Sequence, residues 1–289
     1  MIAYVNGRWL PDKKAYVSIL ERGFLYGDGL FETMRAYNGN IFMLAAHLRR
    51  LRDGLRVVRI QPRWSLTEIE TLLYRALKKN KIQDGLLRLS ITRGVGPIGL
   101  FPTRGDRATL VILTRRPTGA SLSRHRQTYR AITHPAPWLE SESGLAAVKS
   151  ANRLPYILAF ADARSRGMDE ALLVNRNGHV TEGTITNLFI ARNSGLVTPP
   201  ADGGLLPGIT RQAVIGLAKR CRIPIAEARL VRRDIFQADE AFLTNTSLEI
   251  MPLVRIDDRP VGSGQPGTMT EFLRQRFSIW VGSNKRVAR

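Results

Sequence analysis

Two side chains between residues 146 and 189 could do chemistry together, an isolated lysine and an acid beside a hairpin-type turn. Lys149 follows the apolar run L-A-A-V. That segment is typical of the end of a buried strand, where the loss of hydration favours the neutral, nucleophilic amine. Lys149 is therefore a candidate Schiff-base nucleophile. The alternative is a lysine that reaches from a strand end into solvent.

The other lysines have ordinary explanations. They lie in a turn, in a charged run, in the last turn of a predicted helix and in a basic tail, and they are Lys13, Lys14, Lys78, Lys79, Lys81, Lys219 and Lys285. Glu182, followed by Gly183 and Thr184, can lie in a sheet with its carboxylate directed inward. Taken alone, a glutamate beside a hairpin is more often solvated.

Two further segments could bind an anion. At Gly208-Ile209-Thr210 a loop becomes a helix, so free backbone N–H groups and the positive end of the helix dipole could hold a phosphate. Thr244-Asn245-Thr246-Ser247 ends a predicted strand with further donors. Individually these segments are more often a helix cap and a turn. A lysine, an inward carboxylate and a phosphate cradle are together what pyridoxal phosphate needs.

Turn signals and residue periodicity predict the elements of the first half. Asn6-Gly7 and Asn38-Gly39 indicate hairpins, because these residues accept the positive φ angles of a type I′ turn. Leucines at helical spacing from Leu44 and a capping box at Ser65–Glu68 predict two helices. The glycine-rich segment 21–32 is predicted as a loop. Strands are predicted at 2–5, 8–10, 31–37, 41–44, 86–92 and 108–114.

The second half continues the alternation of strands and helices. Asn177-Gly178 predicts a hairpin of 171–174 with 179–184. Further strands are predicted at 127–134, 187–191, 225–230 and 240–244, and helices after Lys149, from about 206 to 219 and at 268–280. We therefore expect an α/β (α+β) protein with a smaller N-terminal domain, a linker and a larger C-terminal domain, at residues 1–117, 118–126 and 127–289.

Composition and charge limit the partners. The 289 residues carry a formal net charge of +20, but the arginines are scattered and no zinc-ligand spacing or RNP-like motif accompanies them. We therefore expect no nucleic-acid partner and no metal site. The N-terminus lacks the long apolar stretch of a signal peptide, no apolar run could span a bilayer, and Cys221 is the single cysteine. These features favour the cytoplasm and no membrane partner.

Six motifs in order resemble the class IV aminotransferases, the fold type IV pyridoxal-phosphate enzymes. They are Y-G-D-G-L-F-E-T-M-R (26–35), H-L-R-R-L (47–51), K-S-A-N-R-L-P (149–155), V-T-E-G-T-I-T-N-L-F (180–189), G-I-T-R (208–211) and L-T-N-T-S-L-E-I-M-P-L (243–253). The resemblance spans nearly the whole chain. It implies a two-domain enzyme with pyridoxal 5′-phosphate between the domains, in a homodimer whose sites take residues from both chains.

The resemblance also implies a role for particular residues. Lys149 is implied as the imine-forming residue and as the base that moves the substrate's α-proton, and Glu182 as the partner of the pyridine nitrogen. The implied phosphate-binding positions are Arg50, Ile209, Thr210 and Thr246. The candidate substrate residues are Tyr26, Arg35 and Arg88, since family members with an arginine at the position of Arg88 use it for carboxylate recognition.

The substrate is less well specified. We expect an aminotransferase that passes an amino group from an amino acid, first a branched-chain L-amino acid, to a 2-oxo acid. The alternatives are an aminodeoxychorismate lyase, which forms 4-aminobenzoate and pyruvate, and a D-amino-acid aminotransferase. Branched-chain enzymes usually carry tyrosine where this chain has Arg153, and N-R-L is more like the lyases. In contrast, T-S-L-E-I-M-P is more like the aminotransferases.

Overall fold

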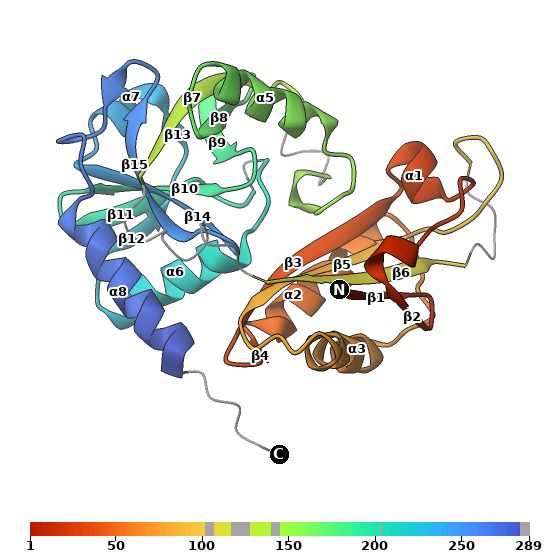
Figure 1. The fold of residues 1–289 in the computed structure, drawn as a ribbon. Coiled ribbons are helices and arrows are strands. Elements are labelled where there is room, and N and C mark those ends of the chain that lie inside the picture. The colour runs from red at the N-terminus through yellow and green to blue at the C-terminus, as the bar shows by residue number, and fades with distance from the viewer. Residues whose placement is uncertain (102–106, 117–127, 140–144, 203, 284–289) are drawn as a thin grey trace. The chain divides into compact units, whose positions relative to one another are not determined.

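The structure, a computed structural model, describes residues 1–101, 107–116, 128–139, 145–202 and 204–283. These residues form two compact units, each with its own sheet (Figure 1). The N-terminal unit contains the described residues up to Arg116, Val148–Asn152 and the end of the last helix from Val281. Lys149 thus lies in the first unit, although it was assigned to the second domain. The predicted linker, 118–126, lies outside the described residues, and the predicted domain limits stay a prediction.

The N-terminal unit is built on a six-stranded antiparallel sheet with the order β2-β1-β6-β5-β3-β4. Its strands are β1 (Ile2–Val5), β2 (Arg8–Pro11), β3 (Gly29–Tyr37), β4 (Asn40–Ile41), β5 (Gly85–Thr92) and β6 (Thr109–Arg115). Both predicted hairpins are confirmed, and Asn6 and Gly7 have φ angles of 47° and 98°. The strand predicted at 41–44 is wrong beyond Ile41, because Met43 turns the chain with a φ of 48° and a helix begins at Leu44.

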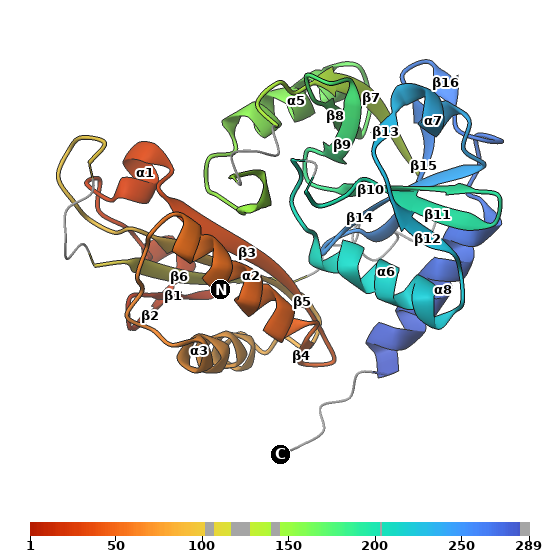
Figure 2. The same cartoon turned by 180° about the vertical axis from the view of Figure 1, so that it is seen from behind.

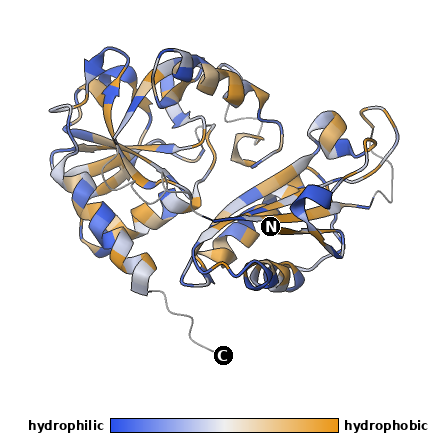
Figure 3. Ribbon diagram, viewed as in Figure 1, coloured by the Kyte–Doolittle hydropathy of each residue, from blue (hydrophilic) through white to orange (hydrophobic). Residues whose placement is uncertain are grey.

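Helices α2 (Leu44–Val57) and α3 (Leu66–Lys79) pack their leucines against the sheet of the N-terminal unit. Alternate residues of β3, Leu30, Met34 and Ala36, join this core, and Figure 3 shows hydrophobic residues along the strands. Successive strand residues point to opposite faces, so Phe31, Thr33, Arg35 and Tyr37 share the other face, as predicted. The short helices η1 (Asp12–Lys14) and α1 (Arg22–Tyr26) complete the unit, and α1 replaces part of the loop predicted at 21–32.

The C-terminal unit contains a mixed sheet with the order β12-β11-β10-β14-β15-β7-β8-β9-β13, and β16 pairs with β15. The strands are β7 (Tyr129–Pro135), β8 (Glu170–Val174), β9 (His179–Gly183), β10 (Asn187–Arg192), β11 (Gly195–Thr198), β12 (Ile225–Glu227), β13 (Leu230–Val231), β14 (Glu240–Asn245), β15 (Glu249–Ile256) and β16 (Arg259–Pro260). β9 and β10 are far apart in this order, yet only three residues join them. The sheet therefore curls until these two strands meet (Figure 2).

The helices of this unit are η4 (Leu145–Ala147), α5 (Leu154–Ser165), α6 (Ile209–Arg220), α7 (Arg232–Phe236) and α8 (Thr268–Ser283). The hairpin of β8 with β9 and the helices after Lys149, at 206–219 and at 268–280 are confirmed in type and place. The strand predicted at 225–230 is wrong as one element, because it is divided into β12 and β13. Among the described residues no helix is long and apolar enough to cross a membrane.

Candidate active site

Lys149 lies on a short segment that is hydrogen-bonded to the start of β3. The Phe31 N–H donates to the Lys149 carbonyl at 3.0 Å, and the Ala151 N–H donates to the Gly29 carbonyl at 2.8 Å. The predicted strand end is wrong, because Lys149 follows the 3₁₀ turn η4 and a bend at Val148. Val148 is buried in the core of the N-terminal unit, which fixes the segment from its other side. Lys149 itself is half-buried.

The Phe31 ring connects Lys149 with Arg88. Lys149 Nζ lies 4.9 Å from the centre of this ring, and Arg88 Cζ, on the neighbouring strand β5, lies 3.8 Å from it. A guanidinium stacked on an aromatic face keeps a fixed orientation while its edge stays able to donate hydrogen bonds. The structure thus places the Lys149 amine and the Arg88 guanidinium, a group that can bind a carboxylate, against the Phe31 ring.

Arg50 is held by a buried carboxylate on β3. Arg50 Nε donates to Glu32 Oε1 at 2.8 Å and Nη2 donates to Glu32 Oε2 at 2.6 Å, in a bidentate pair. Burial raises the pKa of Glu32, but the hydrogen bond from His47 and the charge of Arg50 outweigh it and bring that pKa to about 2. Glu32 is therefore a carboxylate at every ordinary pH, and it fixes the direction of the Arg50 guanidinium.

His47 completes this group from the same helix as Arg50. Its Nδ1 lies 2.7 Å from Glu32 Oε2. Burial lowers the pKa of His47, the charges of Arg50 and Lys149 lower it further, and Glu32 opposes them. A neutral imidazole beside an ionised carboxylate must carry its proton on Nδ1, because Glu32 can only accept. The effect of Lys149 on this pKa places the lysine in the same electrostatic environment.

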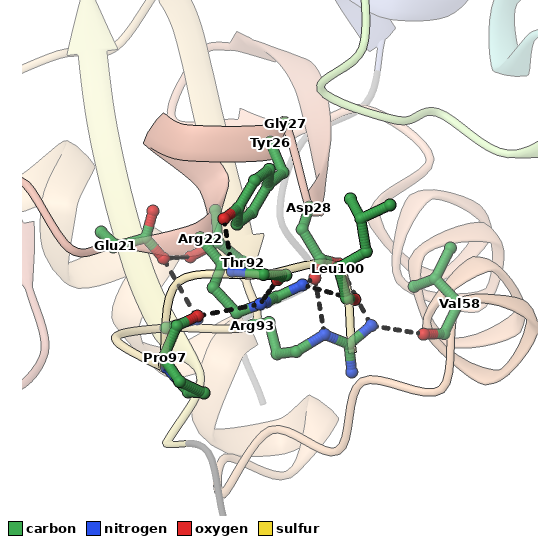
Figure 4. Close-up of polar contacts among 12 residues, drawn as sticks. Glu21, Arg22, Tyr26, Gly27, Asp28, Val58, Thr92, Arg93, Pro97 and Leu100 are labelled. Atoms are coloured by element: carbon green, nitrogen blue, oxygen red, sulfur yellow. Dashed lines mark hydrogen bonds and ion pairs between the residues drawn. The ribbon is translucent and has the colours of Figure 1, made fainter. Parts of the chain in front are cut away.

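Tyr26 and Arg35 occupy different places in the N-terminal unit. Tyr26, at the end of α1, accepts a hydrogen bond from the Gly99 N–H at 2.7 Å, and the Arg22 guanidinium lies 4.9 Å from its ring centre (Figure 4). Arg22 in turn pairs with Asp28 at 3.0 Å. Arg35 lies over the Tyr37 ring, and its buried Nε has no hydrogen-bond partner among the described residues. Arg35 therefore keeps a buried donor to offer.

In the C-terminal unit Glu182 is buried at the end of β9. Its Oε2 accepts hydrogen bonds from the Leu206 N–H at 3.1 Å and from Asn187 Nδ2 at 3.4 Å. Asn187 also donates to the Leu206 carbonyl at 2.9 Å, so one amide side chain connects Glu182 to the loop before α6. The carboxylate is directed inward, as predicted, and its position is fixed by neutral donors.

The N-terminus of α6 has the character of an anion site. Its N-cap residue is Gly208, so no side chain caps the N–H groups of the first turn. A Cβ at this position would lie 2.0 Å from Asn187 Oδ1, so only glycine fits there. Ile209 and Thr210 are the first two helical residues and are buried. Uncapped N–H groups and the helix dipole suit a phosphate.

Thr246 lies in the turn between β14 and β15. Asn245 organises this turn, because its Oδ1 accepts from the Ser247 N–H at 2.8 Å and from the Leu248 N–H at 2.6 Å. Asn245 Nδ2 donates to the Ile185 carbonyl at 3.2 Å, which links this turn to the connection between β9 and β10. Thr246 thus lies in a preformed turn that is hydrogen-bonded to the β9–β10 connection, which directly follows the end of β9 where Glu182 lies.

Arg153 and Tyr156 stand together at the start of α5. The Arg153 guanidinium lies 3.5 Å from the centre of the Tyr156 ring, and its Nη2 donates to the Thr184 carbonyl at 2.6 Å. Burial raises the pKa of Tyr156 to about 12, and the charge of Glu182 adds to the effect, while Arg153 opposes it. Tyr156 is therefore a protonated phenol in the electrostatic environment of Glu182, one helical turn after the position where the family usually has tyrosine.

Most of the expected residues fall into two sets, one in each unit. In the first set Lys149 and Arg88 contact the Phe31 ring, and Arg50 is held by Glu32, the next residue of β3. The second set contains Glu182, Ile209, Thr210 and Thr246. Tyr26 and Arg35 belong to neither set. Sequence reasoning gave no role to Glu32, His47, Asn187 and Tyr156. Glu32 had a detectable signal, since an acid alternates there with core residues of β3. The other three lie in or beside quoted motifs, but their partners come from other elements.

Comparisons with known proteins show the family of this chain. Residues 29–256 match the family described as Amino-transferase class IV, so the chain belongs to that family and is an enzyme of it. The expected family and the two-domain α/β fold type are thereby confirmed.

Individual relatives cover nearly the full length. A Methanocaldococcus jannaschii protein assigned as a branched-chain-amino-acid aminotransferase is 39% identical over 277 residues, which are 96% of this chain and 95% of the relative. The aminodeoxychorismate lyase of Bacillus subtilis is 33% identical over 274 residues, 94% of this chain and 92% of that protein. Relatives of this similarity therefore include both an aminotransferase and a lyase.

Solved structures show the same fold. The branched-chain aminotransferase of the archaeon Thermoproteus uzoniensis, solved with norvaline, has a TM-score of 0.90 at 30% identity, and the match covers 99% of this chain and 96% of that one. A branched-chain amino acid aminotransferase solved with pyridoxamine 5′-phosphate has a TM-score of 0.91 at 28% identity, with 99% of this chain and 95% of that one covered. The fold of this chain is thus one that holds a vitamin B6 cofactor.

Proposed function

We propose that this enzyme is an aminotransferase that moves an amino group from a branched-chain L-amino acid to a 2-oxo acid. Family membership and the branched-chain relatives support transamination in general, and the choice of amino acid is the finer part of the proposal. The observation that carries the catalytic part is Lys149, a half-buried amine beside the Phe31 ring and within the electrostatic reach of the Glu32–His47–Arg50 group.

Pyridoxal 5′-phosphate is the cofactor, and the residues present fit it. We assign binding of its phosphate to the uncapped start of α6 at Ile209 and Thr210 and to the turn that carries Thr246. From the resemblance we assign to Arg50, which Glu32 holds in place, a further phosphate contact. Its pyridine nitrogen matches Glu182, a buried carboxylate whose inward position is set by Asn187 and Leu206. When bound, this group supplies an electron sink for the carbanion that forms at the substrate's Cα.

The chain's own residues supply binding and proton transfer. We assign to Lys149 covalent attachment of the cofactor and, once a substrate amine has replaced it, removal of the proton from Cα. Glu182 would keep the pyridine nitrogen protonated, because a carboxylate stabilises the cation beside it. We assign to Arg88 and Arg35 the binding of substrate carboxylates, since both are arginines on the face of the sheet that carries Phe31. Tyr26 is proposed as a substrate residue on the resemblance alone.

Three features support the choice of substrate. The relative with the branched-chain name matches 96% of this chain, and a solved branched-chain enzyme shares its fold at a TM-score of 0.91. The Phe31 ring would also give a branched apolar side chain a surface to contact. A preference for D-amino acids is the alternative.

A panel of L- and D-amino acids with 2-oxoglutarate tests the proposal. The enzyme should transaminate L-valine, L-leucine and L-isoleucine with the highest kcat/KM, measured by formation of the 2-oxo acids. Lys149→Ala should lose turnover by at least about 10⁴-fold, as expected for a covalent and acid–base residue. Lys219→Ala, at the exposed end of α6, is the matched control and should be unchanged. Substantial turnover by Lys149→Ala, or a preference for D-amino acids, would contradict the assignment.

The lyase is a second candidate, and Arg153 is the observation that favours it. This residue is more like the lyase motif, and its guanidinium is fixed by Tyr156 and the Thr184 carbonyl. Incubation with aminodeoxychorismate separates the two functions. Release of pyruvate without amino transfer to any 2-oxo acid would replace the aminotransferase by a lyase.

We also propose that the enzyme is a homodimer in the cytoplasm. Large apolar side chains are exposed near α1 and after β5, including Phe24 at 70%, Ile98 at 79% and Phe101 at 85%, and α5 exposes Leu154, Ile157 and Leu158. Exposed apolar surface of this extent is typical of protein interfaces. The single cysteine suits a reducing compartment. Sedimentation equilibrium should give twice the chain mass of 32.3 kDa.

A further inference from the structure

Glu170, the first residue of β8, is a fully buried carboxylate for which the proposed chemistry has no use. Its Oε1 accepts hydrogen bonds from the Ala171 N–H at 2.9 Å, from the Thr184 N–H at 3.0 Å and from the Thr184 hydroxyl. Its Oε2 accepts from the Thr186 hydroxyl at 3.0 Å and from the Ile185 N–H at 3.4 Å. Four of these five donors belong to three consecutive residues.

Those residues, Thr184 to Thr186, form the connection between β9 and β10, and we refer to them as the 184–186 turn. The turn is closed tightly, because the Gly183 N–H donates to the Thr186 carbonyl at 2.7 Å. A Cβ at Gly183 would lie 2.1 Å from Thr186 Oγ1 and 2.9 Å from Glu170 Oε2. The glycine therefore allows the turn to fold directly onto the carboxylate.

The 184–186 turn is connected to the proposed cofactor-binding segments of the C-terminal unit. The start of α6 is connected to it indirectly, through Asn187. Glu182 precedes the turn and Asn187 follows it, so the turn sets the distance between them. Its Thr184 carbonyl accepts from Arg153 at the start of α5, at 2.6 Å, and its Ile185 carbonyl accepts from Asn245 beside Thr246, at 3.2 Å. A displacement of the 184–186 turn would therefore reach all of these segments together.

The charge of Glu170 is balanced by neutral donors. No lysine, arginine or histidine among the described residues forms an ion pair with it, and burial raises the pKa of Glu170 although the hydrogen bonds from Thr184, Ala171 and Thr186 oppose this. A carboxylate accepts at both oxygens and donates at neither, so it can satisfy five donors that converge on one place. An amide of the same size would direct an N–H₂ group at some of them.

We propose that Glu170 is a positioning residue of the active site, which holds the 184–186 turn and thereby sets the place of Glu182 and of the Thr246 turn toward the cofactor. This inference rests on the proposed function, in which Glu182 and Thr246 bind pyridoxal phosphate. It assigns no contact between Glu170 and the cofactor. Its effect on the reaction is exerted through the turn alone.

The test compares Glu170→Gln with Glu240→Gln. Glu240 is a matched control, because it too accepts only neutral donors, two N–H groups and one hydroxyl from Met269 and Thr270 at 2.7 to 2.8 Å, but it holds the start of α8. Three quantities are measured for each holoenzyme: the Kd of pyridoxal 5′-phosphate, the pH midpoint of the visible absorption of the bound cofactor, and the thermal unfolding midpoint.

Both variants should lower the unfolding midpoint, whereas only Glu170→Gln should change the cofactor. We expect its Kd for pyridoxal phosphate to rise about tenfold, because donors left without an acceptor relax the turn, and the pH midpoint of the absorption to shift. Equal loss of stability in the two variants, with Kd and absorption of both as in the wild type, would overturn the positioning role and leave Glu170 purely structural.

Two further variants decide the question if Glu170→Gln does not fold. Thr184→Val keeps the side-chain size and removes the hydroxyl that donates to Glu170, so it should shift Kd and absorption in the same direction by a smaller factor. Thr184→Ser restores the hydroxyl and should recover the wild-type values. Wild-type enzyme that neither binds pyridoxal phosphate nor transaminates would refute the proposed function, whereas Thr184→Val identical to wild type would refute the inference alone.

Discussion

Two buried glutamates, Glu32 in the N-terminal unit and Glu170 in the C-terminal unit, differ in the groups that stabilise their carboxylates. Glu32 is compensated by the guanidinium of Arg50 and by His47, and its pKa falls to about 2. Glu170 is compensated by neutral N–H and O–H donors, and its pKa is raised. Both are at most 1% exposed, so the difference comes from their partners.

Charged and neutral partners of a buried carboxylate hold different parts of the structure in place. An ion pair fixes a long charged side chain, and the bidentate contact of Glu32 sets the plane of the Arg50 guanidinium. Converging neutral donors instead fix a backbone turn, since three of the five donors to Glu170 are main-chain N–H groups. The proposed phosphate and ring contacts thus depend on two carboxylates that need not touch the cofactor.

The largest expected effect that separates the two glutamates is on stability. Glu32→Gln leaves the buried guanidinium of Arg50 without its counter-charge, and such a loss costs about 3–5 kcal/mol of the free energy of unfolding. Urea unfolding at pH 7 measures it. Asp53→Asn, which removes the exposed ion pairs of Asp53 with Arg52 and Arg56 on the helix of Arg50, is the control and should change little. A loss no larger than that of the control would contradict the ion-pair account of Glu32.

The contributions of the two carboxylates to the free energy of unfolding should change in opposite directions with pH. The pKa of Glu32 falls from 4.5 to about 2 on folding, so its contribution of roughly 3 kcal/mol is present above pH 4.5 and is lost toward pH 2. The raised pKa of Glu170 acts in reverse, because stability is lost as the pH rises through the folded-state pKa.

Urea titrations of wild type, Glu32→Gln and Glu170→Gln between pH 7 and pH 3 measure this difference. The difference in the free energy of unfolding between wild type and Glu32→Gln should become smaller as the pH falls through that range. The stability of wild type relative to Glu170→Gln should improve over the same range. Parallel curves for all three proteins would show that neither carboxylate changes its pKa on folding.

The smallest expected effect, that of Ser65→Ala, shows whether a general loss of stability alone weakens cofactor binding. Ser65→Ala removes the capping box of α3, in which Ser65 Oγ accepts from the Glu68 N–H at 3.2 Å, and should cost about 1 kcal/mol of the free energy of unfolding. Its Kd for pyridoxal phosphate should stay that of the wild type. A weakened cofactor here would mean that any loss of stability affects binding, and it would remove the distinction drawn for Glu170.

Local signals predicted the regular elements well. Asn-Gly pairs gave the hairpins, because the conformational demand of the turn lies in the two residues themselves. The capping box at Ser65 fixed the start of α3 for the same reason. The alternation of β3 correctly placed Phe31 and Arg35 on one face.

Long-range partners could not be predicted. Glu170 receives donors from residues 14 to 16 positions later, and nothing in E-A-L-L-V distinguishes it from an ordinary strand residue. Lys149 was expected at a strand end, but its segment is fixed by hydrogen bonds to β3, more than 100 residues earlier. The hydroxyl-rich segment 244–247 indicated donors for an anion, and the resemblance to a family singled out Thr246 among them; its phosphate-binding role stays a proposal.

The pairing of residues 148–152 with β3 has a consequence for the independence of the two units. The chain leaves the N-terminal unit, returns at Val148, departs again after Asn152 and comes back at Val281. No single cut of the polypeptide can therefore release either unit as an intact piece, and a fragment ending near Arg116 would lack its lysine-bearing edge. Each unit therefore needs sequence from both sides of the other to be whole.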